Sequence, residues 1–178
     1  MKELLLLTII KEHIEMIKLQ PTDLETHARL ASTYSTLSKL YMDPRQLYPD
    51  EDLLWVSLDY ASLEMVEKFK KASFRCIEEY KILDSYAPND PWIHAQLATV
   101  YRNLNLPQEE MKEYETILKI DSTEHEVLFR LGALYFEHGL SAEGLRLYEK
   151  LKSINEPKAM ELIAFYDSAL SEEYPLFF

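Results

Sequence analysis

The sequence is poor in glycine, cysteine and positive charge, and each shortage excludes a class of protein. It holds three glycines in 178 residues, Gly132, Gly139 and Gly144, which are too few and too scattered for a phosphate-cradling loop. The same scarcity argues against a sheet protein and favours helices. Cys76 is the one cysteine, so the chain can form no internal disulfide and no Cys-x-x-Cys metal site. We therefore expect a helical protein of a reducing compartment, the cytoplasm.

Positive charge and long hydrophobic runs are also scarce. Lys and Arg number 19 against 31 Asp and Glu, a net charge of −12 that repels phosphate backbones, so we expect no nucleic-acid partner. The apolar run at residues 4–10 is too short to span a bilayer. Charged residues follow it instead of a small-residue cleavage site. We expect an ordinary amphipathic helix and no membrane insertion, with a weak signal sequence as the alternative.

Two stretches of the sequence repeat each other in a 34-residue register, in which residue 97 matches residue 131. Each stretch divides into two amphipathic helices, with breaks at residues 105–107 in the first copy and 138–139 in the second. Neither helix of a copy can bury its apolar face alone, but stacked copies build a continuous core. The matching pairs are Leu97 and Leu131, Tyr101 and Tyr135, Tyr114 and Tyr148, and Ile120 and Ile154.

This pattern is similar to the tetratricopeptide repeat. The similarity lies in Leu97-Ala98-x-x-Tyr101, in Leu131-Gly132-x-x-Tyr135 and in the tyrosines of the second helices. The sequence departs from the family at Glu110 and Gly144, where an alanine is usual. The resemblance implies an all-α fold: a right-handed α-solenoid of antiparallel helix pairs whose first helices line a concave, peptide-binding groove.

The remaining sequence can be divided around these two repeats. Leu30, Ala31 and Tyr34 repeat the first-helix spacing, but two prolines, Pro44 and Pro49, interrupt the segment after this helix. A long stretch without glycine or proline comes next; it could form one helix over 51–86, about 54 Å long, or break near residues 70–73. We expect one domain with these parts: an N-terminal helix at 1–21, an atypical unit at 22–90 with an insertion at about 42–51 and a long second helix, repeats at 91–124 and 125–158, a capping helix at 159–171 and a tail at 172–178.

No group of residues in the sequence suggests catalysis. None of the five histidines forms the i, i+4 pair of a helical zinc site, and no glycine motif of a nucleotide-binding loop can be written. Cys76 lies on an apolar helical stripe, which favours a buried side chain over a nucleophile. We expect no enzyme, no cofactor and no metal.

A partner would instead meet the groove that the resemblance implies. Aromatic and arginine side chains carry most of the energy at protein interfaces, and several stand at groove positions here. Trp92 could also cap the interface with the preceding helix, and Phe129 and Phe136 could pack on the C-terminal helix. We favour groove exposure for the two phenylalanines because Leu128, Leu131 and Tyr135 fill the packing positions. The predicted groove residues are Trp92, Gln96, Thr99, Arg102, Asn103, Glu126, Phe129, Arg130, Phe136, Met160 and Ile163.

The function predicted from the sequence is a non-enzymatic scaffold that binds a peptide or helical segment of a partner protein. One alternative is a bacterial secretion-type chaperone, which the length and the acidic charge would fit. Another is a self-associating, homo-oligomeric subunit of a larger assembly that uses the tail and the long helix. The apolar tail at 172–178 could also occupy the groove. An enzyme comes last among these possibilities.

Overall fold

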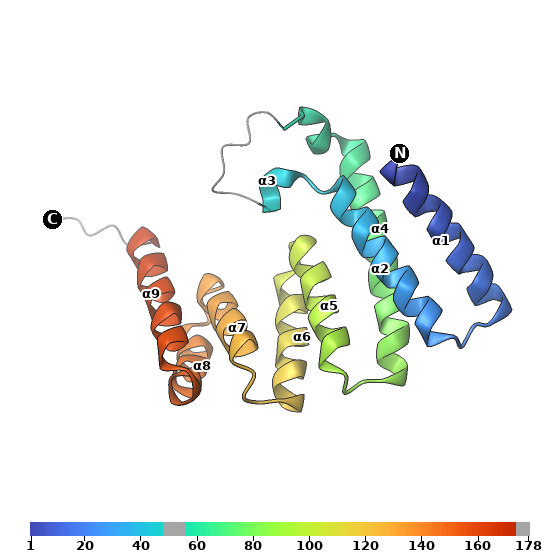
Figure 1. Ribbon diagram of the computed structural model, residues 1–178. Coiled ribbons are helices and arrows are strands. Elements are labelled where there is room, and N and C mark those ends of the chain that lie inside the picture. The colour runs from blue at the N-terminus through green and yellow to red at the C-terminus, as the bar shows by residue number, and fades with distance from the viewer. Residues whose placement is uncertain (48–55, 174–178) are drawn as a thin grey trace. The chain divides into compact units, whose positions relative to one another are not determined.

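All the secondary structure described in the computed structural model is helical (Figure 1). The model describes residues 1–47 and 56–173, and the all-α class expected from the sequence is confirmed for them. The chain divides into two compact units, Met1–Leu104 and Asn105–Phe178. This division falls inside the predicted repeat 91–124, so its two helices belong to different units.

The first unit is built around the pairing of two long helices. Its helices are α1 (Lys2–Leu19), α2 (Leu24–Tyr41), the short α3 (Pro44–Leu47), the 3₁₀ helix η1 (Leu58–Ala61), α4 (Leu63–Tyr86) and α5 (Pro91–Asn103). α2 lies along α4, α1 packs on α2, and α5 packs on α4. Asp23 and Asp90 begin α2 and α5 by accepting hydrogen bonds from the backbone amides of Glu25 and Trp92.

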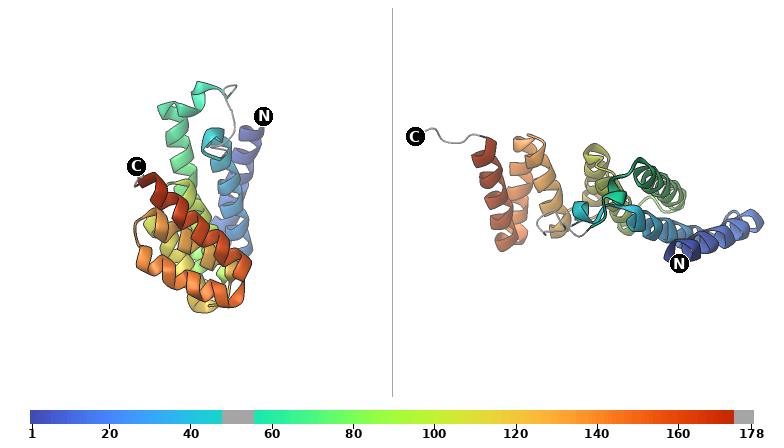
Figure 2. Two further views of the ribbon diagram at one scale, coloured as in Figure 1. Left: turned by 90° about the vertical axis from the view of Figure 1, so that its left-hand side faces the viewer. Right: turned by 90° about the horizontal axis from the view of Figure 1, so that it is seen from above.

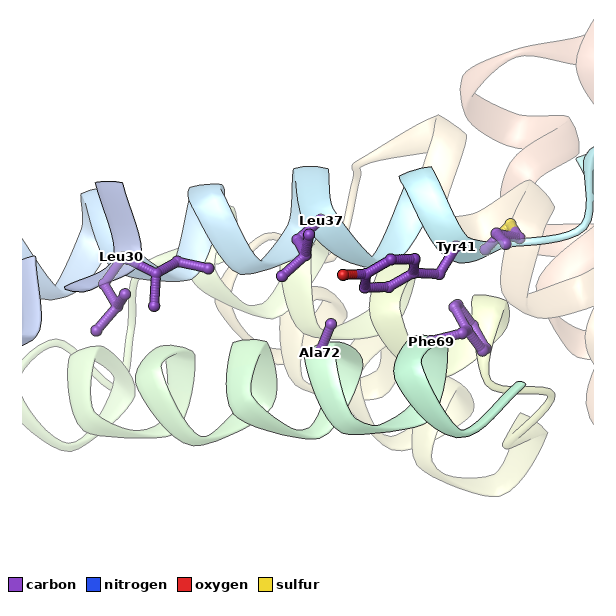
Figure 3. Packing of buried hydrophobic residues seen from close by; sticks show 7 residues of the cluster. Leu30, Leu37, Tyr41, Phe69 and Ala72 are labelled. Atoms are coloured by element: carbon purple, nitrogen blue, oxygen red, sulfur yellow. The ribbon is translucent and has the colours of Figure 1, made fainter. Parts of the chain in front are cut away.

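The core of the first unit lies between α2 and α4. Leu30, Leu37 and Tyr41 of α2 face Phe69 and Ala72 of α4, and all five are buried (Figure 3). They are spaced by seven and four residues on α2 and by three on α4, and these spacings place side chains on one face of a helix. The helical stripes seen in the sequence therefore form this core.

The long second helix is shorter than the full stretch without glycine or proline. α4 begins only at Leu63 and continues without a break through residues 70–73, so both proposals for this segment were wrong. Ser62 ends the preceding turn and caps α4 by accepting a hydrogen bond from the amide of Met65 at 3.3 Å. Of the predicted insertion at 42–51, residues 44–47 form α3, and residues 48–51 lie outside the described part.

The second unit packs three helices around a fourth. It contains α6 (Pro107–Ile120), α7 (His125–Glu137), α8 (Ser141–Ile154) and α9 (Glu156–Glu173). α7 contacts all the others, and Figure 2 shows α7, α8 and α9 packed against one another. Leu128, Leu151, Ala159 and Leu162 are fully buried at the centre of this packing.

The 34-residue register of the sequence is also the register of the helices. α5 and α7 begin at residues 91 and 125, and α6 and α8 begin at residues 107 and 141. The predicted breaks contain Asn105 (φ 55°) and Gly139 (φ 72°), which match each other in the same register and are the only two described residues with positive φ. At Gly139 the Leu140 amide donates to the Tyr135 carbonyl at 2.8 Å and the Gly139 amide to that of Phe136 at 3.1 Å, the Schellman ending of a helix.

Two further expectations concern the membrane and the C-terminus. No described helix is both long enough and apolar enough to cross a bilayer. The helix expected at 159–171 is α9, which begins three residues earlier and ends at Glu173. Beyond Glu173 the predicted tail lies outside the described residues, and so does the question of whether it occupies a groove.

Candidate interaction surfaces

α5 carries the five groove residues predicted in the first unit. Trp92 is 50% exposed, and the edge of its ring meets Tyr80 of α4 with the ring centres 5.9 Å apart. Trp92 therefore contacts the preceding helix and is half exposed, and its place in a groove stays a prediction. Arg102 is exposed, whereas Gln96, Thr99 and Asn103 are half-buried. The Thr99 hydroxyl donates to the Ala95 carbonyl of its own helix at 2.9 Å.

In the second unit, four side chains from two helices form one connected group, which we call the α7–α9 cluster: Glu126, Phe129 and Arg130 of α7 and Lys158 of α9. The Glu126 carboxylate accepts hydrogen bonds from Arg130 Nε at 3.2 Å and from Lys158 Nζ. The Lys158 ammonium also lies 5.5 Å from the ring centre of Phe129, in cation–π geometry. The hydrogen bond from Lys158 lowers the pKa of Glu126, and Arg130 adds to this.

Three members of this cluster were predicted from the sequence, and Lys158 was not. Met160 and Ile163 were predicted from the last helix instead, and they follow Glu126 and Phe129 by the same 34 residues. However, α8 and α9 are joined by Asn155 alone, and α9 begins at residue 156, earlier than that register would place it. At about 100° per residue, Met160 and Ile163 point roughly 140° or more away from Lys158. Met160 is exposed and Ile163 half-buried, and the described contacts do not join either to the cluster.

Phe136 requires a correction. It was expected in the groove, but it is only 6% exposed and belongs to the core of the second unit. Its ring packs against Tyr166 of α9, with centres 4.3 Å apart and planes tilted by 30°. Tyr135, which was expected to take this packing position, is only half-buried and donates its hydroxyl to Glu115 of α6 at 2.9 Å.

A pair of buried histidines was overlooked in the sequence. Residues 21–34 and 88–101 share the pattern Pro-x-Asp-x-x-x-His-Ala-x-Leu-Ala-x-x-Tyr, which contains His27 and His94. Each imidazole is buried, and its Nε2 lies beside the carbonyl oxygen of the proline six residues earlier, at 3.1 Å for Pro21 and 3.0 Å for Pro88. A carboxylate of α4 lies near each histidine, Glu79 near His27 and Asp84 near His94. Only histidines four residues apart were considered in the sequence. This pattern, whose two histidines are 67 residues apart, was therefore missed.

The two histidines lie near different carboxylates of α4. His27 Nδ1 lies 2.6 Å from Glu79, so both of its ring nitrogens face acceptors and both must carry a proton. His94 Nε2 lies beside its proline carbonyl and 3.5 Å from Asp84. Burial by itself lowers the pKa of His27, but the hydrogen bonds to Glu79 and to the Pro21 carbonyl outweigh it, and the net shift is upward. When it is protonated, His27 therefore joins α2 to α4 through Glu79.

Reactive groups are scarce in the described part of the chain. There, no three His, Cys, Asp or Glu side chains gather closely enough to hold a metal ion. The Cys76 thiol is fully buried, donates to the Ala31 carbonyl at 3.3 Å, and has its pKa raised to about 12 by burial. A thiol in that state is not a nucleophile. An open hollow of about 530 Å³ lies at the α4–α5 turn, lined by residues 86–91.

Comparison with known proteins identifies the fold. No family model and no curated protein matches the sequence. Two crystal structures of MamA each give a TM-score of 0.53 at 15% identity; they cover 92% and 95% of this chain and 86% of the MamA chain. The C-terminal TPR-containing domain of a putative FK506-binding protein from Plasmodium falciparum matches at 16% identity over 96% of this chain and 89% of its own, with a TM-score of 0.38 that is too low to support an argument.

The similarity to MamA shows that the two chains share a fold. Together with the helix pairs and the 34-residue register, it confirms the tetratricopeptide-type, all-α fold expected from the sequence. The predicted handedness and the predicted groove residues other than Phe136 stay predictions.

Proposed function

We propose that this chain is a protein-interaction scaffold that holds a peptide or helical segment of a partner against its first helices. The fold supports this proposal because stacked helix pairs leave one face of each first helix free of packing. In the second unit, that face of α7 carries Arg130 and one side of Phe129. This observation carries the proposal.

The α7–α9 cluster offers a partner both an apolar and a polar contact. The Phe129 ring is half-buried and packs against the core of the second unit. Its side chain would therefore lose little conformational entropy on binding. The Arg130 side chain is 51% exposed, and its described hydrogen bond uses Nε alone, which leaves guanidinium N–H groups for a ligand's carbonyl or carboxylate. Rigid aromatic rings beside arginine are typical of binding hot spots.

α5 offers a comparable surface in the first unit. The exposed half of Trp92 is held in place by Tyr80, and Arg102 is exposed further along the helix. Each unit thus presents a partly buried aromatic ring together with an arginine on its first helix. We propose that each contributes a separate contact to a partner.

The test uses a phage-displayed library of random peptides, selected on the intact protein. The selected peptides would be labelled and their affinity measured by fluorescence anisotropy for the wild type, Arg130→Ala and Arg146→Ala. Arg146 is the matched control, an exposed arginine on the second helix α8. We expect Arg130→Ala to weaken binding about tenfold, the loss of one hot-spot contact, and Arg146→Ala to leave it unchanged.

The same comparison can be made for the first unit. Arg102→Ala is paired with Arg75→Ala, since Arg75 is exposed on α4 and bonded to Glu78 on its own helix. If the selected peptides bind all four variants as they bind the wild type, the first helices do not form the binding surface and the proposal is wrong.

A further inference from the structure

Exposed apolar side chains gather on α1 more than on any other described helix. α1 packs on α2 through Leu6, Ile10, Ile14 and Ile17, which belong to the core of the first unit. The rest of its surface nevertheless presents further large apolar side chains, with exposures that reach 71% at Leu4 and 84% at Leu19. The exposed set is Leu4, Leu5, Leu7, Met16 and Leu19. Concentrations of this kind mark interaction surfaces.

The exposed surface of α1 is apolar at both ends of the helix. Three leucines lie near the N-terminal end, and Met16 and Leu19 lie near the C-terminal end. Between them the exposed residues include both charge signs, Lys11 with Glu12 and Glu15. A surface that is apolar, then mixed in charge, then apolar again is complementary to itself when one copy is reversed. A two-fold interface requires this property because the same patch serves both partners.

The distribution of charge favours a second copy of this chain as the occupant. The side chains of α1 include three lysines and three glutamates and are neutral in sum, within a chain of net charge −12. Because each copy is acidic, two copies repel each other electrostatically. The repulsion is weak where the neutral α1 of one copy meets the neutral α1 of the other. A basic partner would be drawn to the acidic remainder instead.

We propose that α1 forms a homodimer interface by packing antiparallel against α1 of a second copy. In this arrangement Leu4 of one copy lies beside Leu19 of the other. Lys11 of one copy then comes within one helical turn of Glu12 and Glu15 of the other. Within a single helix Leu4 and Leu19 are about 22 Å apart, so the pairing can be tested by position.

The first experiment measures association by sedimentation across the micromolar range. We expect the wild type to form a reversible dimer and the double variant Leu4→Glu with Leu19→Glu to raise its dissociation constant at least tenfold. Leu63→Glu is the matched control, a leucine 75% exposed on α4 whose replacement should leave the dimer intact. A wild type that stays monomeric at every concentration overturns the proposal. So does a dimer that survives the double variant.

A charge exchange covers the case in which the double variant fails to fold. Lys11→Glu alone and Glu15→Lys alone should each weaken the dimer, and the two changes together should restore it. The geometry is tested with Leu4→Cys and Leu19→Cys under mild oxidation. An antiparallel pair cross-links only when the two variants are mixed. Cross-linking of each variant with itself would mean a parallel pair, and no cross-link in a sample that dimerises would place the interface elsewhere. Either result contradicts the proposal.

Discussion

The ring of Phe136 lies directly over Gly144, in the space that a side chain at residue 144 would need. A Cβ atom built on Gly144 would lie 2.6 Å from Phe136 Cδ1 and closer still to Cε1. Real Cβ contacts do not occur at such distances, so one of the two groups would have to move. The ring cannot move easily because it also packs against Tyr166 and lies in the core of the second unit. Gly144 is therefore the residue that lets Phe136 enter the core.

We predict that Gly144→Ala destabilises the protein although alanine is the better helix former. The gain of about 1 kcal/mol in helix propensity is smaller than the cost of overpacking, and we expect a net loss of about 1–2 kcal/mol in the free energy of unfolding. Urea denaturation measures it. Adding Phe136→Leu should recover part of the loss.

Gly132→Ala provides the comparison for this prediction. Its Cβ would lie 2.7 Å from Leu162 Cδ2, the end of a flexible side chain that can rotate, so we expect a smaller cost. A Gly144→Ala variant as stable as the wild type would show that the Phe136 ring is free to shift.

Gly139 should be sensitive for a different reason. Nothing lies within 4 Å of a Cβ built there, but its φ of 72° is unfavourable for residues with side chains. We expect Gly139→Ala to cost about 1 kcal/mol and Gly139→Asn less, because asparagine tolerates this conformation and Asn105 adopts it at the equivalent turn. Equal losses for the two variants would argue against a backbone origin.

Stability should fall as the pH rises through the titration of His27. The pKa of His27 in the folded protein is raised above the ordinary 6.5 of the unfolded chain. The stabilisation is therefore fully present below pH 6.5 and is lost as the pH passes the folded pKa. The charged groups facing the ring are Glu79 on α4 and Asp23 at the start of α2, and both favour the protonated form.

Urea denaturation over a pH series measures this effect. Glu79→Gln should flatten the pH dependence, because the imidazolium loses its carboxylate partner. Glu78→Gln is the matched control; it alters the neighbouring, exposed carboxylate that pairs with Arg75, and the slope should stay as in the wild type. A slope that Glu79→Gln does not change would assign the titration to another group.

Cys76 should report on the separation of α2 from α4. Its thiol is fully buried between these helices, and its pKa of about 12 keeps it protonated at neutral pH. We predict that a thiol reagent labels it at least about a hundredfold more slowly in the native protein than in urea. The Leu63→Cys variant, with a second thiol at a position that is 75% exposed, should gain one rapidly labelled site. Rapid labelling of the wild type would mean that the two helices separate readily.

The fold could be predicted further than the interaction surfaces. The 34-residue spacing and the breaks at Asn105 and Gly139 placed α5 to α8, since apolar periodicity and turn residues are local signals. The start of α4 was missed because Ser62 as a cap is a weaker signal than a stretch without proline or glycine.

Side-chain packing decides how exposed each predicted groove residue is, and it buries Phe136. Phe136 and Met160 occupy the expected helices, but their exposure depends on contacts with other helices. The space at Gly144 accepts Phe136, and the one-residue connection before α9 turns Met160 away from Lys158. Neither effect can be predicted from the helical periodicity or from the 34-residue register of the sequence.

The ion pair between His27 and Glu79 joins residues 52 positions apart, and this separation has a consequence for synthesis. At roughly 5–20 residues per second, a ribosome needs about 3–10 s to add Glu79 after His27. During that interval the apolar face of α2 has no α4 to pack against. α1 has already been made, and its buried side chains belong to the same core. α1 is therefore able to cover part of the apolar face of α2 until α4 arrives.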